Sequence, residues 1–202
     1  MKISVTTNFP DIERAMSRLD EQVRNRAAVS AVNKMLDQAR TQMARAITQR
    51  FNIPSAVVKE SLRVRGAVNQ RGRLAIEGAL VGGDGRRRSL NMIRFMERKV
   101  SLAQAKRRAK AGTLESIYVQ VRKDKAARPL DGAFIGNKGR TIFRREGRDR
   151  LSLKPVQVID VQQMFNTKAI NAQVVQLIND KFAAIFKHEA EYFTSKKFGG
   201  GR

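Results

Sequence analysis

The segment from residue 12 to residue 50 is the feature that most limits what this chain can fold into. Apolar residues recur in it at steps of three or four, and no Gly or Pro interrupts them before Pro54. This spacing predicts an amphipathic α-helix. Its apolar positions are Ile12, Met16, Leu19, Val23, Ala27, Ala31, Met35, Ala39, Met43, Ala46 and Ile47. We expect one long helix from Pro10-Asp11 to about Arg50, roughly 60 Å long at ~1.5 Å per residue.

Several positions on the apolar face of this predicted helix carry small side chains. A helix of that length usually packs along a partner as well as along its own domain, and small side chains let a neighbouring element approach closely. We therefore predict a subunit interface at Ala27, Ala31, Ala39 and Ala46.

The middle of the chain changes to the period of β-strands. A short helix is expected in "NIPSAVVKESLRV", with Pro54 at its start and the Ser55 hydroxyl as a cap. Leu62, Val64, Leu74 and Ile76 then alternate with charged residues around "NQRGR", which predicts a hairpin with a glycine turn. Further strands are expected in "SIYVQVRK", "DGAFI", "RTIFRR" and "KPVQVID", where a proline marks an edge strand or a strand entry.

The last zone returns to helical spacing and ends at "FGGGR", a helix terminator. Its apolar stripe comprises Met164, Ile170, Val174, Leu177, Ile178, Phe182, Ile185 and Phe186. The predicted fold class is α+β, with a long N-terminal helix, a central basic antiparallel sheet and a C-terminal amphipathic helix. We expect a single domain over 1–202, with an extended basic loop or arm at 82–113, containing a short helix, and a flexible tail at 196–202.

Positive charge is concentrated in the predicted sheet and arm. The formal net charge of the chain is +23, and residues 61–155 alone carry 25 basic and 8 acidic side chains, a net charge of +17. Nucleic acid is the first partner to consider, with phosphate contacts independent of sequence. A solvated basic face, or one that meets acidic protein neighbours, explains the charge equally well. The predicted contact residues are Arg86, Arg87, Arg88, Lys106, Arg107, Arg108, Lys110, Arg144, Arg145, Arg148 and Arg150.

One hairpin combines this charge with apolar residues. The stretch "RPLDGAFIGNKGRTIFRREGRDR", residues 128–150, is predicted to form two short strands around a turn at Gly136 and Gly139. We expect Phe134 or Phe143 to anchor the hairpin in the core.

Other classes of function receive little support from the sequence. The chain has no Cys, which excludes disulfides and Cys-based metal or nucleophile sites. No apolar run approaches the ~20 residues of a membrane-spanning helix, and no signal-peptide pattern opens the chain. The lone His188 is interpreted as a surface or packing residue, and "VGGDGRRRS" lacks the spacing of a phosphate-binding P-loop. We expect no enzyme activity, no cofactor and no metal, although Asp131, Glu146, Asp149 and Asp160 would be the carboxylates to test for a metal-dependent nuclease.

The order of features resembles a known family. The helix-to-strand junction "ARAITQRFNIPSAVVKESLRVRGA", the basic middle, the "GAFI" strand, "IFRREGRDRLSLKPVQVID" and the closing helix together resemble the minor tail protein Z family of long-tailed bacteriophages. The resemblance covers roughly residues 20–190. It is most specific in 132–135 and in the R-x-G-x-x-R pattern at 145–150.

The resemblance implies a structural role in the virion. Members of this family complete the head-proximal end of the tail, so the chain is expected to be made in the host cytoplasm and built into the neck region. The expected partners are further copies of the chain in a ring, with a hexamer as our expectation, the tail terminator and tail tube proteins, the tape measure protein and double-stranded DNA. The alternative is a sequence-independent nucleic-acid-binding protein, which explains the charge but not the long helix beside a glycine-turn hairpin.

Overall fold

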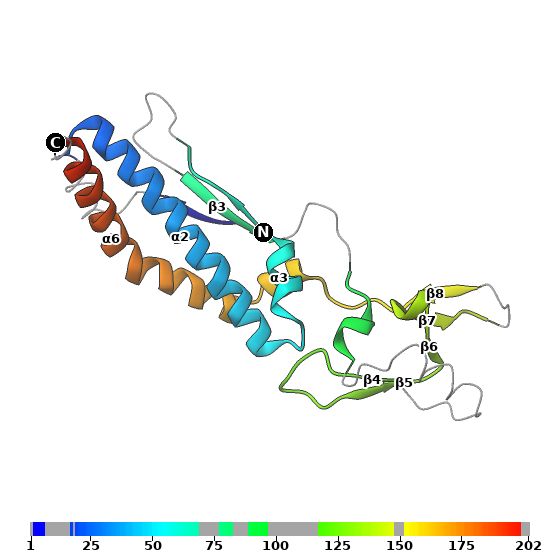
Figure 1. Cartoon of the computed structure of the whole chain (residues 1–202). Helices are drawn as coiled ribbons and strands as arrows, with labels where there is room; N and C mark the ends of the chain where they lie inside the picture. Colours follow the sequence, from blue (N-terminus) through cyan, green and yellow to red (C-terminus); the bar gives the residue numbers. More distant parts are fainter. Residues whose placement is uncertain are drawn as a thin grey trace.

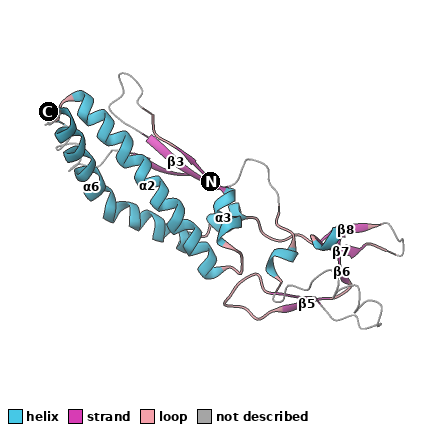
Figure 2. Cartoon of the chain, in the orientation of Figure 1, coloured by secondary structure: helices cyan, strands magenta, loops and turns pink. Residues whose placement is uncertain are grey.

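The computed structural model of the chain describes residues 2–6, 17, 19–68, 77–82, 89–96, 117–147 and 152–198. These residues form an elongated molecule, with two long helices and a small sheet at one end and short strands at the other (Figure 1). We call residues 2–6, 19–68, 77–82 and 161–198 the helical lobe, and residues 89–96, 117–147 and 152–160 the β lobe. Helix and strand thus mix as an α+β fold, which confirms the predicted fold class (Figure 2).

Helix α2 spans Glu21–Arg50 and forms the backbone of the helical lobe. The Asp20 side chain caps its first turn by accepting a hydrogen bond from the Gln22 amide at 2.9 Å. The predicted helix of 12–50 was therefore wrong at its start, because Leu19 and Asp20 are not helical and Asp20 begins a new helix. Its predicted end at Arg50 is confirmed, and the part of the prediction at 10–16 lies outside the described residues.

The closing helix is divided into α5, Val161–Phe165, and α6, Lys168–Phe198. Asp160 and Gln163 form a reciprocal capping box at the start of α5. The predicted apolar stripe is therefore split, since Met164 lies in α5 while its remaining members follow the break at Asn166 and Thr167. Lys196 and Lys197, expected in the flexible tail, belong to the last turn of α6.

Helices α2 and α6 lie side by side and run in opposite directions (Figure 1). Lys197 Nζ near the end of α6 lies 2.7 Å from Asp20 Oδ1 at the start of α2. The apolar faces of both helices are buried, including Met35, Phe182 and Phe186 at 0–2% exposure. Most of the core of the molecule lies along this helix pair.

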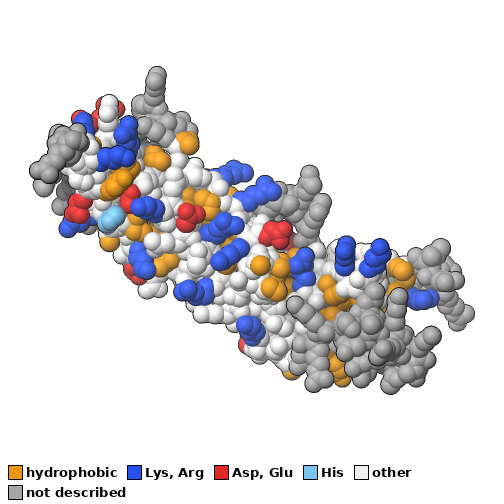
Figure 3. Space-filling view, viewed as in Figure 1, with side chains coloured by type: hydrophobic (Ala, Val, Ile, Leu, Met, Phe, Trp, Pro, Cys, Tyr) orange, Lys and Arg blue, Asp and Glu red, His pale blue; other side chains and the backbone are white. Residues whose placement is uncertain are grey.

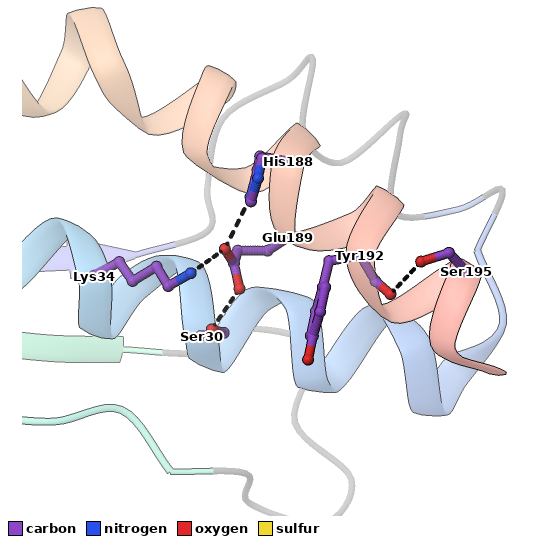
Figure 4. Close-up of polar contacts among 6 residues, drawn as sticks. All are labelled: Ser30, Lys34, His188, Glu189, Tyr192 and Ser195. Atoms are coloured by element: carbon purple, nitrogen blue, oxygen red, sulfur yellow. Dashed lines mark hydrogen bonds and ion pairs between the residues drawn. The ribbon is translucent and has the colours of Figure 1, made fainter. Parts of the chain in front are cut away.

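A buried carboxylate in the C-terminal half of α6 links it to the N-terminal half of α2 (Figure 4). Glu189 is 3% exposed, and it accepts hydrogen bonds from Ser30 Oγ at 2.6 Å and Lys34 Nζ at 2.5 Å. His188 Nδ1 lies 3.2 Å from the same carboxylate. Burial raises the pKa of Glu189, but the hydrogen bonds from Lys34, Ser30 and His188 outweigh it, so the pKa lies below its ordinary value of 4.5.

A three-stranded antiparallel sheet packs against α2. It consists of β1 (Lys2–Thr6), β3 (Glu77–Gly82) and β2 (Leu62–Arg65), in the order β1-β3-β2. The predicted hairpin is confirmed in that β2 pairs with a returning strand, which is β3, while Leu74 and Ile76 lie outside the described residues. Strand β1 was missed by the sequence reasoning. A Cβ on Gly78 would lie 2.5 Å from Leu36 Cδ1, so this glycine lets β3 approach α2 closely.

Helix α3, Ser55–Ser61, confirms the predicted short helix between α2 and β2. Pro54 occupies its N-cap position without a side-chain cap, so the expected capping hydroxyl of Ser55 is wrong, because Ser55 is already the first helical residue. The end of α2 also contacts the β lobe through backbone hydrogen bonds. Asn52 N donates to Val121 O at 3.0 Å and Lys123 N to Arg50 O at 3.0 Å.

The β lobe contains two small antiparallel sheets. The first pairs β4 (Ile117–Val119) with β5 (Arg128–Leu130), and the second has the order β6-β7-β8, from Ala133–Gly136, Thr141–Arg145 and Leu153–Pro155. Short 3-10 turns lie at η1 (Met92–Phe95) and η2 (Asn137–Gly139). Strand β8 is an edge strand, which confirms the position expected for Pro155.

The described part of the predicted arm, residues 89–96, packs against these sheets. Phe95 is 0% exposed and joins the core of the helical lobe. The Asn91 side chain holds β7, because its Nδ2 donates to Ile142 O at 3.1 Å and its Oδ1 accepts from Ile142 N at 2.9 Å. The apolar piece "LNMIRFM" is therefore part of the packed structure, and the remainder of 82–113 beyond Gly82 lies outside the described residues.

Within the described residues, none of the helices combines the length and the apolar character that crossing a bilayer requires.

Candidate interaction surface on the basic β lobe

The β6-β7 hairpin ends in a turn of left-handed backbone. Asn137, Lys138 and Gly139 have φ values of 49°, 54° and 82°. Asn and Gly tolerate this region, whereas Lys138 holds it against its usual preference. The predicted glycine turn is therefore right for Gly139 but misplaces Gly136, which is the last residue of β6.

The turn and β7 present a group of exposed cations. Lys138, Arg140, Arg144 and Arg145 are all exposed. Two other cations of the lobe are neutralised locally: Arg122 pairs with Asp124 through hydrogen bonds of 2.8 and 2.5 Å, and Lys154 pairs with Glu146. The hydrogen bonds from Arg122 hold the pKa of Asp124 below its ordinary value. Among the described residues of the lobe, the cations that make no ion pair are Arg94, Lys123, Lys125, Arg128, Lys138, Arg140, Arg144 and Arg145.

The two faces of the β6-β7-β8 sheet differ in burial. Ile142 on one face is 0% exposed and anchors the sheet. The other face carries Phe134, Phe143 and Pro155, which are cross-strand neighbours in the register Phe134↔Phe143 and Phe143↔Pro155. Both phenylalanines are half-buried and the proline is exposed. The expectation that Phe134 or Phe143 anchors the hairpin in the core was therefore wrong, because the alternation of β7 turns Ile142 inward instead.

The phenylalanines form a small cluster on this outer face. Their ring centroids are 6.1 Å apart, and the Arg145 guanidinium carbon lies 5.8 Å from the Phe134 centroid. The Phe143 ring also packs directly on Gly136, since a Cβ there would lie 2.9 Å from Phe143 Cδ2. At the β end of the face drawn in Figure 3, exposed apolar side chains lie beside Lys and Arg.

Of the predicted contact residues, the structure describes Arg144 and Arg145. They are adjacent in β7, so they lie on opposite faces of the sheet, with Arg145 beside the phenylalanine pair. The others fall outside the described residues, namely Arg86, Arg87, Arg88, Lys106, Arg107, Arg108, Lys110, Arg148 and Arg150. A contact role for these cations stays a prediction.

The four alanines of the predicted subunit interface lie in the core of the chain itself. Ala27, Ala31 and Ala39 are 0% exposed and Ala46 is 4% exposed. Their small size lets the chain's own elements pack closely on α2. A role in a subunit interface stays a prediction, and it would require those covering elements to move.

The residues considered for catalysis do not converge in the described structure. His188 has 74% side-chain exposure. Asp160 caps α5, Glu146 pairs with Lys154, Asp131 is exposed, and Asp149 lies outside the described residues. No group of three or more His, Cys, Asp or Glu side chains within the described part of the chain is arranged to hold a metal ion.

The sequence reasoning missed the outer face that carries the half-buried phenylalanine pair, and the role of Asn91. A signal for the first was available, because Ile142 and Phe143 are adjacent in one strand and must face opposite ways. Only one of them can be buried in a sheet with one covered face. No local signal could have shown that the Asn91 side chain bonds to a strand some fifty residues away.

Comparison with known proteins now gives this surface a context. The chain matches the family model described as prophage minor tail protein Z (GPZ) over residues 11–196, so it belongs to that family. No curated protein and no solved structure matches the chain. The protein is therefore a structural component of a phage tail, located in the tail of the virion and in contact with other tail components.

Proposed function

We propose that this protein completes the head-proximal end of the tail as a ring subunit at the tail–neck junction, and that its β lobe makes the basic contact there. The observation that carries the proposal is the set of exposed cations without ion pairs on the β lobe, most of which lies outside the main core. The chain that carries them belongs to a minor tail protein family. None of these cations makes an ion pair within the described chain, so ion pairing does not account for them. They are available to an anionic partner.

Two anionic partners are compatible with these charges: the end of the genome in the neck, and acidic surfaces of neighbouring tail proteins. Duplex DNA is bound through its phosphates with release of counterions, so the logarithm of the binding constant falls with the logarithm of salt concentration by about 0.9 per neutralised phosphate. The proposal includes both partners, and the two are separated by whether removal of the hairpin cations changes the salt slope of DNA binding.

The first experiment measures binding of the full chain to duplex DNA of unrelated sequences over a range of salt. If the hairpin contacts phosphates, replacing Arg140, Arg144 and Arg145 by Ala should reduce the salt slope by up to about three, equally for all sequences. A matched control replaces Lys168, Lys181 and Lys187 on exposed positions of α6 by Ala. An unchanged salt slope in the hairpin variant would rule out contact between this hairpin and DNA.

The second experiment tests the place in the tail. Particles made without the protein are complemented with the parent or with the hairpin variant and imaged by negative-stain electron microscopy. We expect rings of the parent at the head-proximal end and tails joined to heads. Tails that join heads equally well without the protein, or density for it elsewhere in the tail, would refute the position that we propose.

The alternative function is sequence-independent nucleic-acid binding with no place in the neck. It is favoured by the net charge of +17 in residues 61–155. It predicts tight DNA binding by the isolated chain together with normal tail completion by the hairpin variant.

A further inference from the structure

We propose that the outer face of the β6-β7-β8 sheet, formed by Phe134, Phe143, Leu153 and Pro155 with Arg145 at its edge, docks an acidic protein segment that carries a large apolar side chain. The inference deepens the contact role proposed above and rests on it only for the identity of the partner as a tail component. It starts from the apolar character of this face, which a purely electrostatic surface would not need.

The four apolar side chains share one face by register. Phe134 pairs with Phe143 and Phe143 with Pro155, while Leu153 pairs with Arg145, two residues farther along β7. Leu153 is 39% exposed, and Pro155 is also exposed. The register therefore places a continuous apolar row on the outer face of the sheet, with Leu153 and Pro155 exposed and the two phenylalanines half-buried. An apolar row rimmed by polar side chains fits an interaction site.

Cations flank the apolar row along the strand direction. Arg145 lies over the Phe134 ring on one side of the row, and Lys138 and Arg140 lie at the β6-β7 turn beyond the other side. None of these three makes an ion pair within the described chain. An occupant with carboxylates on either side of an apolar side chain would match this arrangement in both charge and polarity.

The same charges argue against a second copy of this chain on the face. Two β lobes brought together would place unpaired cations opposite unpaired cations, and like charges at an interface are unfavourable.

The geometry of the rings argues against a nucleic acid base as the occupant. The Arg145 guanidinium lies near the Phe134 ring, and Phe143 packs against the backbone of Gly136. Stacking proteins keep ring faces open for bases. Duplex DNA offers phosphates, which gain nothing from contact with Phe143, Leu153 and Pro155. A protein segment satisfies the cations and the apolar row together.

The test uses a short synthetic peptide of Asp and Glu residues around a central Trp and Leu as the probe. The full chain contains no Trp, so the emission of the peptide reports binding without background from the protein. We expect saturable binding that weakens as salt is raised. Replacing Phe143 by Ser should reduce the affinity about tenfold. Replacing Arg145 by Gln should weaken binding less and lower its salt dependence.

Matched controls distinguish binding at this face from non-specific binding to other exposed apolar or basic side chains. Val175 is 44% exposed on α6, so Val175→Ser removes an exposed apolar side chain elsewhere and should leave peptide binding unchanged. Lys187→Gln removes an exposed cation from α6 in the same way. A second peptide, with Asn and Gln in place of the acidic residues, should bind at least about tenfold more weakly.

Several outcomes would overturn the inference. Equal binding of the two peptides, or unchanged affinity in Phe143→Ser, would show that the face does not select an acidic, apolar segment. Displacement of the acidic peptide by single-stranded oligothymidine at equal concentration would favour a nucleic acid as the occupant. Concentration-dependent self-association that Phe143→Ser abolishes would favour a second copy of the chain. The circular dichroism and unfolding midpoint of Phe143→Ser are compared with those of the parent, and Leu153→Ser provides a second variant on the same face. Peptide binding is measured without particles, so its failure is distinguishable from a failure of the proposed position in the neck.

Discussion

The helical lobe buries a continuous apolar core, whereas the β lobe buries few of its side chains. The core cluster includes Met35, Ile47, Phe165, Phe182 and Phe186 from the helical lobe. In the described β lobe, Phe95 joins this core, and Val119 and Ile142 are buried outside it. The two lobes therefore differ in how far packing explains the positions of their apolar residues. Packing explains most apolar positions of the helical lobe but leaves the phenylalanines of the β lobe unexplained.

The lobes also differ in how they use charge. In the helical lobe, Glu189 and Asp20 tie α6 to α2 through Lys34 and Lys197. In the β lobe, the acidic residues Asp124 and Glu146 each neutralise one neighbour and leave a larger group of cations unpaired. Residues that a fold does not require are the ones available to a partner. The difference therefore assigns the helical lobe to stability and the β lobe to contacts with other molecules.

The largest effect is expected from a charge placed in the helical core. Ala31 is 0% exposed, so Ala31→Glu would bury a carboxylate without a partner and should cost on the order of 4–5 kcal/mol or more, enough to prevent folding. Ala183→Glu, at an exposed position of α6, is the control and should fold normally. Circular dichroism of the two purified variants distinguishes them. A folded Ala31→Glu variant would show that this part of α2 is less enclosed than the structure indicates.

The next effect sharpens the contrast between buried and exposed aromatic residues. Phe182→Ala in α6 should destabilise the chain by about 3–5 kcal/mol, because Phe182 is fully buried. Phe143→Ala in β7 should cost less, roughly 1–3 kcal/mol, since its ring is half-buried rather than fully enclosed. Urea unfolding of both variants gives the two values. Equal losses would mean that the phenylalanine face is part of the core after all.

An effect smaller than that of Phe182→Ala concerns the buried carboxylate between the helices. Glu189→Gln should lower the free energy of unfolding at neutral pH by about 1.5–3 kcal/mol, because charge-assisted hydrogen bonds from Lys34 and Ser30 are weakened. The folded-state pKa of Glu189 is lowered, so its stabilisation is present above the ordinary value of 4.5 and is lost as pH falls through the folded pKa.

The difference between parent and variant should therefore shrink as the pH is lowered past 4.5. Glu191→Gln on the exposed side of α6 is the control and should follow the parent at every pH. A gap between parent and Glu189→Gln that stays constant down to acid pH would contradict the assigned role of Glu189.

The long helices were predictable because their apolar spacing is uninterrupted, and the α+β class followed from the change of period after Pro54. The break before α2 was not predicted, although Asp20 is a good N-cap residue, because the apolar spacing runs through Leu19 without a gap. Strand β1 is five residues long and has a single partner, β3, far along the chain. Such pairing depends on tertiary contacts that local spacing does not encode.

The candidate site was predictable in its charge but not in its geometry. Composition indicates a basic middle segment, and the hairpin at Phe134 and Phe143 was placed correctly. The surroundings of that hairpin include η1, and Asn91, the N-cap residue of η1, bonds the backbone of Ile142 from outside the hairpin. The sequence of the hairpin alone does not show which face is buried, so the half-buried phenylalanine pair could not be assigned to the outer face from sequence.

The tie between Asp20 and Lys197 has a consequence for the order in which the molecule is made. Helix α2 leaves the ribosome early, but the helix that covers its apolar face follows only after the entire β lobe has been translated. Contacts across such a separation close slowly, because a long loop must be ordered before any apolar area is gained. The nascent chain therefore carries an uncovered apolar segment during much of its synthesis. The yield of folded protein is expected to fall when no chaperone protects α2 during that interval.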